Sequence, residues 1–299
     1  MAPAFHVILR IIQSISGFPI FPIMPGRIYE SVTGFFIQDE GYDSSIAIPP
    51  RFGLLDATEH RWSNTTNRLR ELNEKSEPGV AYKLIIAGRH GQGFHNLGEL
   101  KYGTERWNAY WAKLDGDGEI VWGPDPLLTD LGEEQARDAN VVWVQERAAG
   151  LPSPDGLYCS PMTRALRTCE LTFANLVDFS EQHPLILENA REIYGVHSCD
   201  MRRSRSCIRA KFLAFDIEED FTEEDQLYDP NVRETYTHVA KRAHSVLDRI
   251  FEDNKGSLVS ITAHSGFIRG LVATTKHATV ELQTGGILPM IVKGTVVEQ

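Results

Sequence analysis

The sequence predicts an α/β fold, a three-layer sandwich in which helices cover both faces of a mainly parallel central sheet. Three short apolar runs, at residues 82–88, 156–160 and 258–263, have the length of buried strands. Segments with helical signals follow each of these runs, and strands that alternate with helices are typical of parallel sheets. A last strand is expected at residues 288–293.

The helices expected between these strands have recognisable ends. Thr129 precedes Asp130 and Glu133, a pattern typical of a helix N-terminus, and this helix is expected to run to Ala149, before a Gly-Leu-Pro-Ser-Pro stop. A second helix is expected at residues 161–177, with Pro161 in the first position, where its missing N–H has no intrahelical partner. Residues 233–253 and 266–275 are the other expected helices.

The N-terminal quarter of the chain has a different character. Residues 1–78 include Pro19, Pro22, Pro25, Pro49 and Pro50 among their seven prolines and show little periodicity, so we expect an extension that wraps the core, with a helix near residues 58–75. A polar turn at residues 74–79 separates it from the main domain, residues 79–299. Apolar residues at helical spacing within 7–15 indicate a helix docked on the protein's own surface, or alternatively on a membrane surface.

Composition limits the class of protein. The 299 residues carry 30 Lys and Arg against 41 Asp and Glu, a formal net charge of −11, which argues against nucleic acid or an anionic membrane as a partner. No apolar run is long enough to span a bilayer. The four cysteines form no CxxC pair, which favours reduced, buried thiols in a cytoplasmic protein. An anion would therefore need a local basic pocket.

Such a pocket is expected where the three strands end. Arg89 and His90 follow the first strand, Arg164 lies shortly after the second, and His264 follows the third. The carboxyl ends of parallel strands meet at one edge of the sheet, which is where open α/β sheets bind ligands. Guanidinium and imidazole groups together suit a dianion such as a phosphoryl group.

These residues belong to motifs that resemble those of the histidine phosphatase superfamily, the phosphoglycerate-mutase-like proteins, over about residues 80–293. The motifs occur in the family's order: Arg89-His90-Gly91 with Asn96, Leu128–Ala136 (LTDLGEEQA), Ser160–Ala165 (SPMTRA) with Thr168, Glu192, and His264-Ser265-Gly266. Two further stretches are similar to fungal phosphomutase-like members: Trp122-Gly123-Pro124-Asp125-Pro126 and His197-Ser198-Cys199-Asp200.

The resemblance implies a metal-independent phosphatase without a cofactor, which hydrolyses a small phosphomonoester through a phosphohistidine. His90 would attack phosphorus, and Glu192 would protonate the leaving oxygen and later activate water. The phosphoryl oxygens would be held by Arg89, Asn96, Arg164 and His264. A phosphomutase, or a hydrolase of a diphosphate ester in specialised metabolism, is the alternative.

Other interpretations depend on particular residues. Gly91 and Gly93 follow a strand as in a dinucleotide-binding loop, but Asn96 occupies the third glycine position. A catalytically silent binding protein is disfavoured because the catalytic residue types are present. The spacing of His90 and His95 does not match a helical metal site. Arg202, Arg203, Arg205 and Arg209 form either a lid or second anion subsite, or a structural cluster paired with acidic residues 218–225. The oligomeric state and the substrate stay open.

Overall fold

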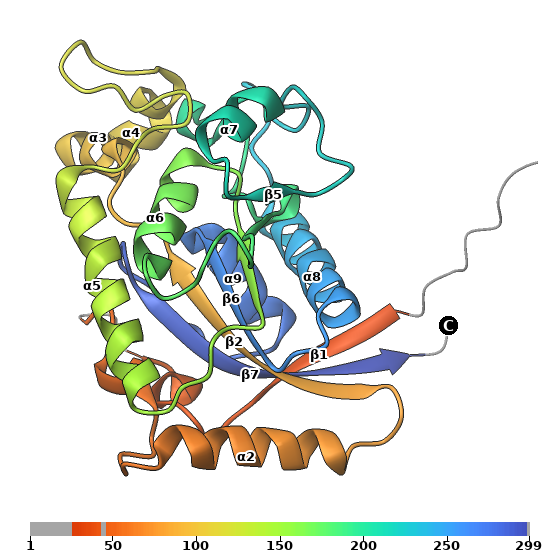
Figure 1. Cartoon of the computed structure of the whole chain (residues 1–299). Helices are drawn as coiled ribbons and strands as arrows, with labels where there is room; N and C mark the ends of the chain where they lie inside the picture. The colour runs from red at the N-terminus through yellow and green to blue at the C-terminus, as the bar shows by residue number, and fades with distance from the viewer. Residues whose placement is uncertain (1–25, 43–45, 298–299) are drawn as a thin grey trace, which may run out of the picture.

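The fold is built on one seven-stranded sheet. The computed structural model describes residues 26–42 and 46–297 (Figure 1). The strand order is β1-β7-β2-β6-β3-β4-β5. In this order, each pair of neighbours from β2 through β6, β3 and β4 to β5 is parallel. Strand β7 is antiparallel to both of its neighbours, β1 and β2. The bounds are β1 Gly26–Val32, β2 Val80–Arg89, β3 Gly156–Cys159, β4 Leu185–Ile186, β5 Asp216–Ile217, β6 Leu258–Ala263 and β7 Ile287–Val297. The predicted mainly parallel α/β sheet is confirmed.

Alternating side chains of β2 show that both faces of the sheet are covered. Leu84 and Ile86 belong to an apolar core that also contains Trp143 of α5 (Asp130–Ala148) and residues of α6 (Thr163–Phe173). Ile85 and Ala87 belong to a second core formed with α8 (Tyr236–Asp253) and α9 (Ser265–Thr274). Successive strand residues point to opposite faces, so the two cores are the two interfaces of a three-layer sandwich.

The predicted helix positions hold with small corrections. Thr129 caps α5 as expected, because its side chain accepts a hydrogen bond from the Gly132 N–H. The prediction that Pro161 is the first helical residue is wrong: α6 begins at Thr163, where Asp125 accepts hydrogen bonds from both the backbone N–H and the hydroxyl. A side chain distant in sequence therefore sets this helix start.

The described part of the N-terminal region joins the sheet and covers it. β1 pairs with β7 along its whole length, and α2 (Arg61–Glu74) lies within the helix expected at 58–75. The helix expected within residues 7–15 lies outside the described residues. Among the described residues, no helix is long and apolar enough to cross a membrane.

Several short elements that the sequence did not predict lie beyond the carboxyl ends of the central strands. They are α3 (Phe94–Tyr102), α4 (Thr104–Ala109), α7 (Arg205–Lys211) and the 3₁₀ turns η3 (Trp111–Lys113) and η5 (Ser198–Asp200). Figure 1 shows α3, α4 and α7 at one end of the sheet. A small core around Trp107, Trp122 and Cys199 holds α4, η3 and η5 together, whereas Ile208 of α7 belongs to the core that contains Leu84. Together these elements cover the sheet edge where the predicted site residues lie.

Candidate active site

The structure brings together residues that follow three neighbouring strands. β2, β6 and β3 lie side by side, and His90 and His264 follow the first two of them directly. The ring centroids of His90 and His264 are 5.0 Å apart. Arg164, from the first turn of α6, has its Nε 3.4 Å from Nε2 of His90. The expected convergence at one sheet edge is therefore observed.

The backbone fixes which nitrogen of His90 carries the proton. Nδ1 lies 2.7 Å from the carbonyl oxygen of Gly91, and because a carbonyl only accepts, Nδ1 is the donor. Nε2 then carries the lone pair. Burial, together with the positive charges of Arg164 and Arg89, holds the pKa of His90 well below its usual value. The imidazole is therefore neutral at physiological pH, the form that can act as a nucleophile.

Two glycines allow the loop after β2 to adopt this shape. A Cβ on Gly91 would lie 2.0 Å from the carbonyl oxygen of Gly132, and a Cβ on Gly132 would lie 2.1 Å from the carbonyl oxygen of Gln92. The start of α5 thus packs directly against the loop that carries His90. This contact explains why the Thr-Asp-Leu-Gly segment accompanies the Arg-His-Gly segment in the sequence.

Arg164 is completely buried, and hydrogen bonds fix the position of its guanidinium group. Its Nη1 donates to the carbonyl oxygen of Cys199 at 2.8 Å, and its Nη2 donates to Oδ1 of Asp200 at 3.0 Å. The other carboxylate oxygen, Oδ2, accepts from Arg233 at 2.8 Å. Although burial opposes it, the charges of Arg233 and Arg164 hold the pKa of Asp200 below its usual value. A buried carboxylate therefore orients the guanidinium that faces His90.

His264 is oriented in an analogous way by Ser160. The Ser160 hydroxyl accepts from the Met162 N–H at 3.3 Å and lies 2.7 Å from Nε2 of His264, to which it can donate. When the Ser160 hydroxyl donates to Nε2, the proton of His264 lies on Nδ1, and this atom is buried with no partner among the described residues. Burial and the charge of Arg164 hold the pKa of His264 well below its usual value. A neutral N–H donor is thus left without an acceptor.

Arg89 has a similar unused donor. Its Nη1 donates to the carbonyl oxygen of Leu282 at 2.7 Å, whereas its buried Nε has no partner in the described part of the chain. Buried polar groups normally have hydrogen-bond partners, and an unpaired one costs about 1–3 kcal/mol. The unpaired donors of Arg89 and His264 therefore point to an acceptor that binds between them.

Glu192 lies at the N-terminus of α9. One carboxylate oxygen accepts from the backbone N–H of Ile193, and the other accepts from the Gly266 N–H at 3.1 Å. A Cβ on Gly266 would approach Glu192 to 2.0 Å, so only glycine permits this contact. The side chain is partly buried.

Asn96 has a local structural contact as well as access to the site. Its Oδ1 accepts from the Gly93 N–H at 2.9 Å and so caps α3. Since the amide oxygen is used in this cap, the NH₂ group remains as a donor. Asn96, Arg89, His90 and Glu192 all line one cavity of about 350 Å³, and the fully buried Arg164 and His264 lie directly behind its wall. That volume suits a small molecule.

Comparison with known proteins identifies the family. Residues 86–284 match the sequence profile of the histidine phosphatase superfamily (branch 1). The chain belongs to the histidine phosphatase superfamily. It is 36% identical over 294 residues to a "Probable phosphoglycerate mutase" of Arthroderma benhamiae, covering 91% of this chain and 86% of the relative.

Two other fungal relatives are similar to this chain. A "Phosphomutase-like protein 3" of Candida albicans is 32% identical over 267 residues, which cover 88% of this chain and 79% of the relative. A "Probable phosphoglycerate mutase" of Saccharomyces cerevisiae is 32% identical over 234 residues, which cover 71% and 79%. The predicted family, and its similarity to fungal phosphomutase-like members, are thus confirmed.

Sequence reasoning did not assign several of the side chains that line this cavity, and four polar ones stand out. They are His95, His197, Asp200 and Arg233. His197 and Asp200 belong to a stretch noted only as similar to fungal relatives, and His95 was considered only as a metal ligand. Arg233 gave no local signal, because its link to the site is the ion pair with Asp200, 33 residues away.

Arg202, in the arginine cluster after Asp200, has a structural role. Arg202 is 3% exposed and binds Glu188 and the backbone carbonyls of Thr222 and Glu224. Arg203 donates to the Pro124 carbonyl, and Arg205 donates to the Phe221 carbonyl. Arg202, Arg203, Arg205 and Arg209 do not line the catalytic cavity. For Arg202, the structural interpretation of the cluster therefore holds.

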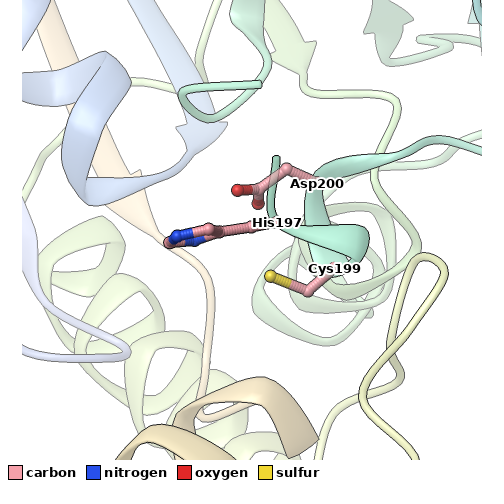
Figure 2. A group of neighbouring side chains, drawn as sticks. All are labelled: His197, Cys199 and Asp200. Atoms are coloured by element: carbon pink, nitrogen blue, oxygen red, sulfur yellow. The ribbon is translucent and has the colours of Figure 1, made fainter. Parts of the chain in front are cut away.

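His197, Cys199 and Asp200 form a compact group whose donor atoms lie within 4.8 Å of one another (Figure 2). Both oxygens of Asp200, however, are bound by arginines. Burial also raises the pKa of the Cys199 thiol well above its usual value. A cation here would meet two guanidinium groups and a protonated thiol, so this donor set does not fit a metal ion.

Proposed function

We propose that this histidine phosphatase hydrolyses a small phosphomonoester through a phosphohistidine on His90, without a metal. The observation that carries the proposal is the pairing of a neutral His90, with its lone pair on Nε2, and buried donors on Arg89 and His264 that have no acceptor within the described part of the chain. A phosphoryl group supplies three acceptor oxygens and an electrophilic centre to this arrangement.

The proposed reaction has two steps. In the first, Nε2 of His90 attacks phosphorus, the P–N bond forms, and the ester P–O bond breaks. Glu192 gives its proton to the leaving oxygen. In the second step Glu192 takes a proton from water, the water oxygen attacks phosphorus, and the P–N bond breaks to release phosphate. Arg89, Arg164, His264 and the Asn96 amide donate to the phosphoryl oxygens throughout, where preorganised donors lower the barrier most.

Trapping the phosphoenzyme tests the role of His90. Wild-type protein mixed with p-nitrophenyl phosphate and quenched in alkali should carry one phosphohistidine, detected by mass spectrometry at the peptide with His90. His90→Ala should abolish both the adduct and turnover, while EDTA should leave wild-type turnover unchanged. Trapped phosphate that persists in His90→Ala, or activity that needs an added divalent cation, would refute the proposal.

The leaving group tests the role of Glu192. Glu192→Gln cannot give a proton, so hydrolysis of an alkyl phosphate should fall by about 10²–10⁴-fold. Hydrolysis of p-nitrophenyl phosphate should fall much less, because nitrophenolate leaves without protonation. The measurement is kcat/KM for both esters. Equal losses for the two esters would remove Glu192 as the acid.

A mutase is the second candidate, because the fungal relatives carry that description in their names. The two candidates differ in the fate of the phosphoenzyme. A phosphatase releases inorganic phosphate in step with nitrophenol, whereas a mutase retains phosphate on His90 and returns it to an added hydroxyl acceptor. Simultaneous measurement of phosphate and nitrophenol, with and without 3-phosphoglycerate as the acceptor, separates them.

A further inference from the structure

His95 lies beside the proposed nucleophile in nearly the same relation as His264. It belongs to the first turn of α3 and lines the catalytic cavity. The ring centroids of His90 and His95 are 5.4 Å apart, compared with 5.0 Å for His90 and His264. The His90 ring is therefore flanked by two imidazoles, of which the family motifs account for only one.

The polar character of His95 is not used within the described chain. Its Nδ1 is buried and has no hydrogen-bond partner among the described residues. The ring packs against Gly93, where a Cβ would lie 2.7 Å from Nδ1. Burying an unpaired polar atom costs about 1–3 kcal/mol, a cost that an apolar ring of similar size would not have. A partner in the cavity would remove this cost.

The electrostatic surroundings limit what His95 can do. Burial and the charge of Arg164 hold the pKa of His95 well below its usual value, so the ring is neutral at physiological pH. A metal ion bound between His90 and His95 would face the guanidinium groups of Arg89 and Arg164. A neutral imidazole in this place keeps one N–H donor and adds no charge to repel those arginines.

We propose that His95 is a further catalytic residue, which donates a ring N–H hydrogen bond to the phosphoryl group during its transfer to and from His90. This inference rests on the proposed function. His95 joins His264 as a second imidazole that holds the phosphoryl oxygens, and it places this donor on α3, the helix that also carries Asn96.

Three variants of His95 separate a donor from a packing residue. His95→Phe keeps the ring size and removes the N–H, so kcat with p-nitrophenyl phosphate should fall by about 10–100-fold. His95→Asn and His95→Gln each restore an amide N–H near one ring nitrogen, and one of them should recover most of this loss. His183→Phe, at a histidine on the surface away from the cavity, is the matched control and should behave as wild type.

Two further measurements make the result independent of turnover. The inhibition constant of vanadate, a phosphoryl mimic, should rise in His95→Phe in parallel with the loss of kcat. The melting temperature of His95→Phe should equal or exceed that of wild type, because an unpaired polar atom has been removed. If His95→Phe does not fold, ¹⁵N-histidine NMR of the wild-type protein tests the contact directly. The His95 ring resonance is assigned as the one that is absent in His95→Gln, and vanadate should shift it.

The outcomes distinguish this inference from the function on which it rests. Wild-type protein that neither hydrolyses p-nitrophenyl phosphate nor binds vanadate would overturn both. If the wild-type protein is active and His95→Phe stays within about twofold of it in kcat and in the vanadate inhibition constant, only the role of His95 would be overturned. The role of His95 alone would also be overturned if both amide variants are as slow as His95→Phe, or if the NMR resonance of His95 does not respond to vanadate.

Discussion

Two groups of arginines in this acidic protein differ in how their donors are used. Arg202, in the structural cluster, donates from all three side-chain nitrogens to Glu188 and to carbonyl and hydroxyl oxygens of residues 203 and 222–224. Arg89, at the catalytic cavity, is also largely buried, yet its Nε has no partner among the described residues. The buried Arg202 side chain thus has every nitrogen bound within the protein, whereas the Arg89 side chain at the cavity keeps a donor for a ligand.

Replacement of Arg89 should strongly reduce the rate of catalysis. Arg89→Gln removes a donor that acts on the phosphoryl oxygens, and kcat/KM with p-nitrophenyl phosphate should fall by about 10²–10³-fold. The free energy of unfolding should change little, because among residues 26–42 and 46–297 the lost side chain has one hydrogen-bond partner, the Leu282 carbonyl. Steady-state kinetics and urea denaturation measure the two quantities.

The opposite result is expected for Arg202. Arg202→Gln leaves Glu188 and several buried carbonyls without their donor, so the free energy of unfolding should fall by about 3 kcal/mol. The fraction that stays folded should keep kcat/KM within about threefold of wild type, since Arg202 does not line the cavity. If Arg202→Gln instead lost activity without losing stability, the distinction between the two groups of arginines would be wrong.

Two buried aspartates differ in the same way as the two groups of arginines. Asp200 and Asp225 each bind arginines, but Asp200 orients Arg164 toward His90, whereas Asp225 binds Arg191 at 2.6 Å. Asp200→Asn and Asp225→Asn should each lower the free energy of unfolding by about 3 kcal/mol. Only Asp200→Asn should also lower kcat/KM, by about tenfold or more, because Arg164 loses its support. Similar activity in the two variants would deny Asp200 a positioning role.

Sequence patterns predicted those parts of the molecule that depend on neighbouring residues. The apolar run of β6 and the cap at Thr129 were predicted correctly because strand burial and helix capping leave local signals. The convergence of His90, Arg164 and His264 followed from the geometry of parallel strands, once each was placed after its strand.

Features that depend on distant contacts were not predicted. The start of α6 was misplaced because Asp125, 38 residues earlier, caps Thr163. Arg233 was missed because the carboxylate that brings it to the cavity, Asp200, lies 33 residues away. Composition could not separate Arg202 from Arg164 either, since only the three-dimensional partners show which of the two faces the nucleophile.

A smaller effect is expected on the free energy of unfolding in mild acid. His90, His95 and His264 have a pKa well below the usual value in the folded protein, whereas in the unfolded chain it is about 6.5. As the pH falls below about 6.5 the unfolded state binds more protons, so the free energy of unfolding decreases, by up to about 1.4 kcal/mol per pH unit for each histidine.

His95→Gln removes one of these three groups from the cavity. The slope of the unfolding free energy between pH 6 and 5, measured by urea denaturation, should therefore be smaller in His95→Gln than in wild type by up to about 1.4 kcal/mol per pH unit. Carboxylates with a lowered pKa, such as Asp200, add to the slope only at more acidic pH, near and below about 4. An unchanged slope in His95→Gln would mean that the ring is protonated in the folded protein at pH 5. A protonated ring would add charge beside Arg164, and the assignment of His95 as a neutral donor would then fail at that pH.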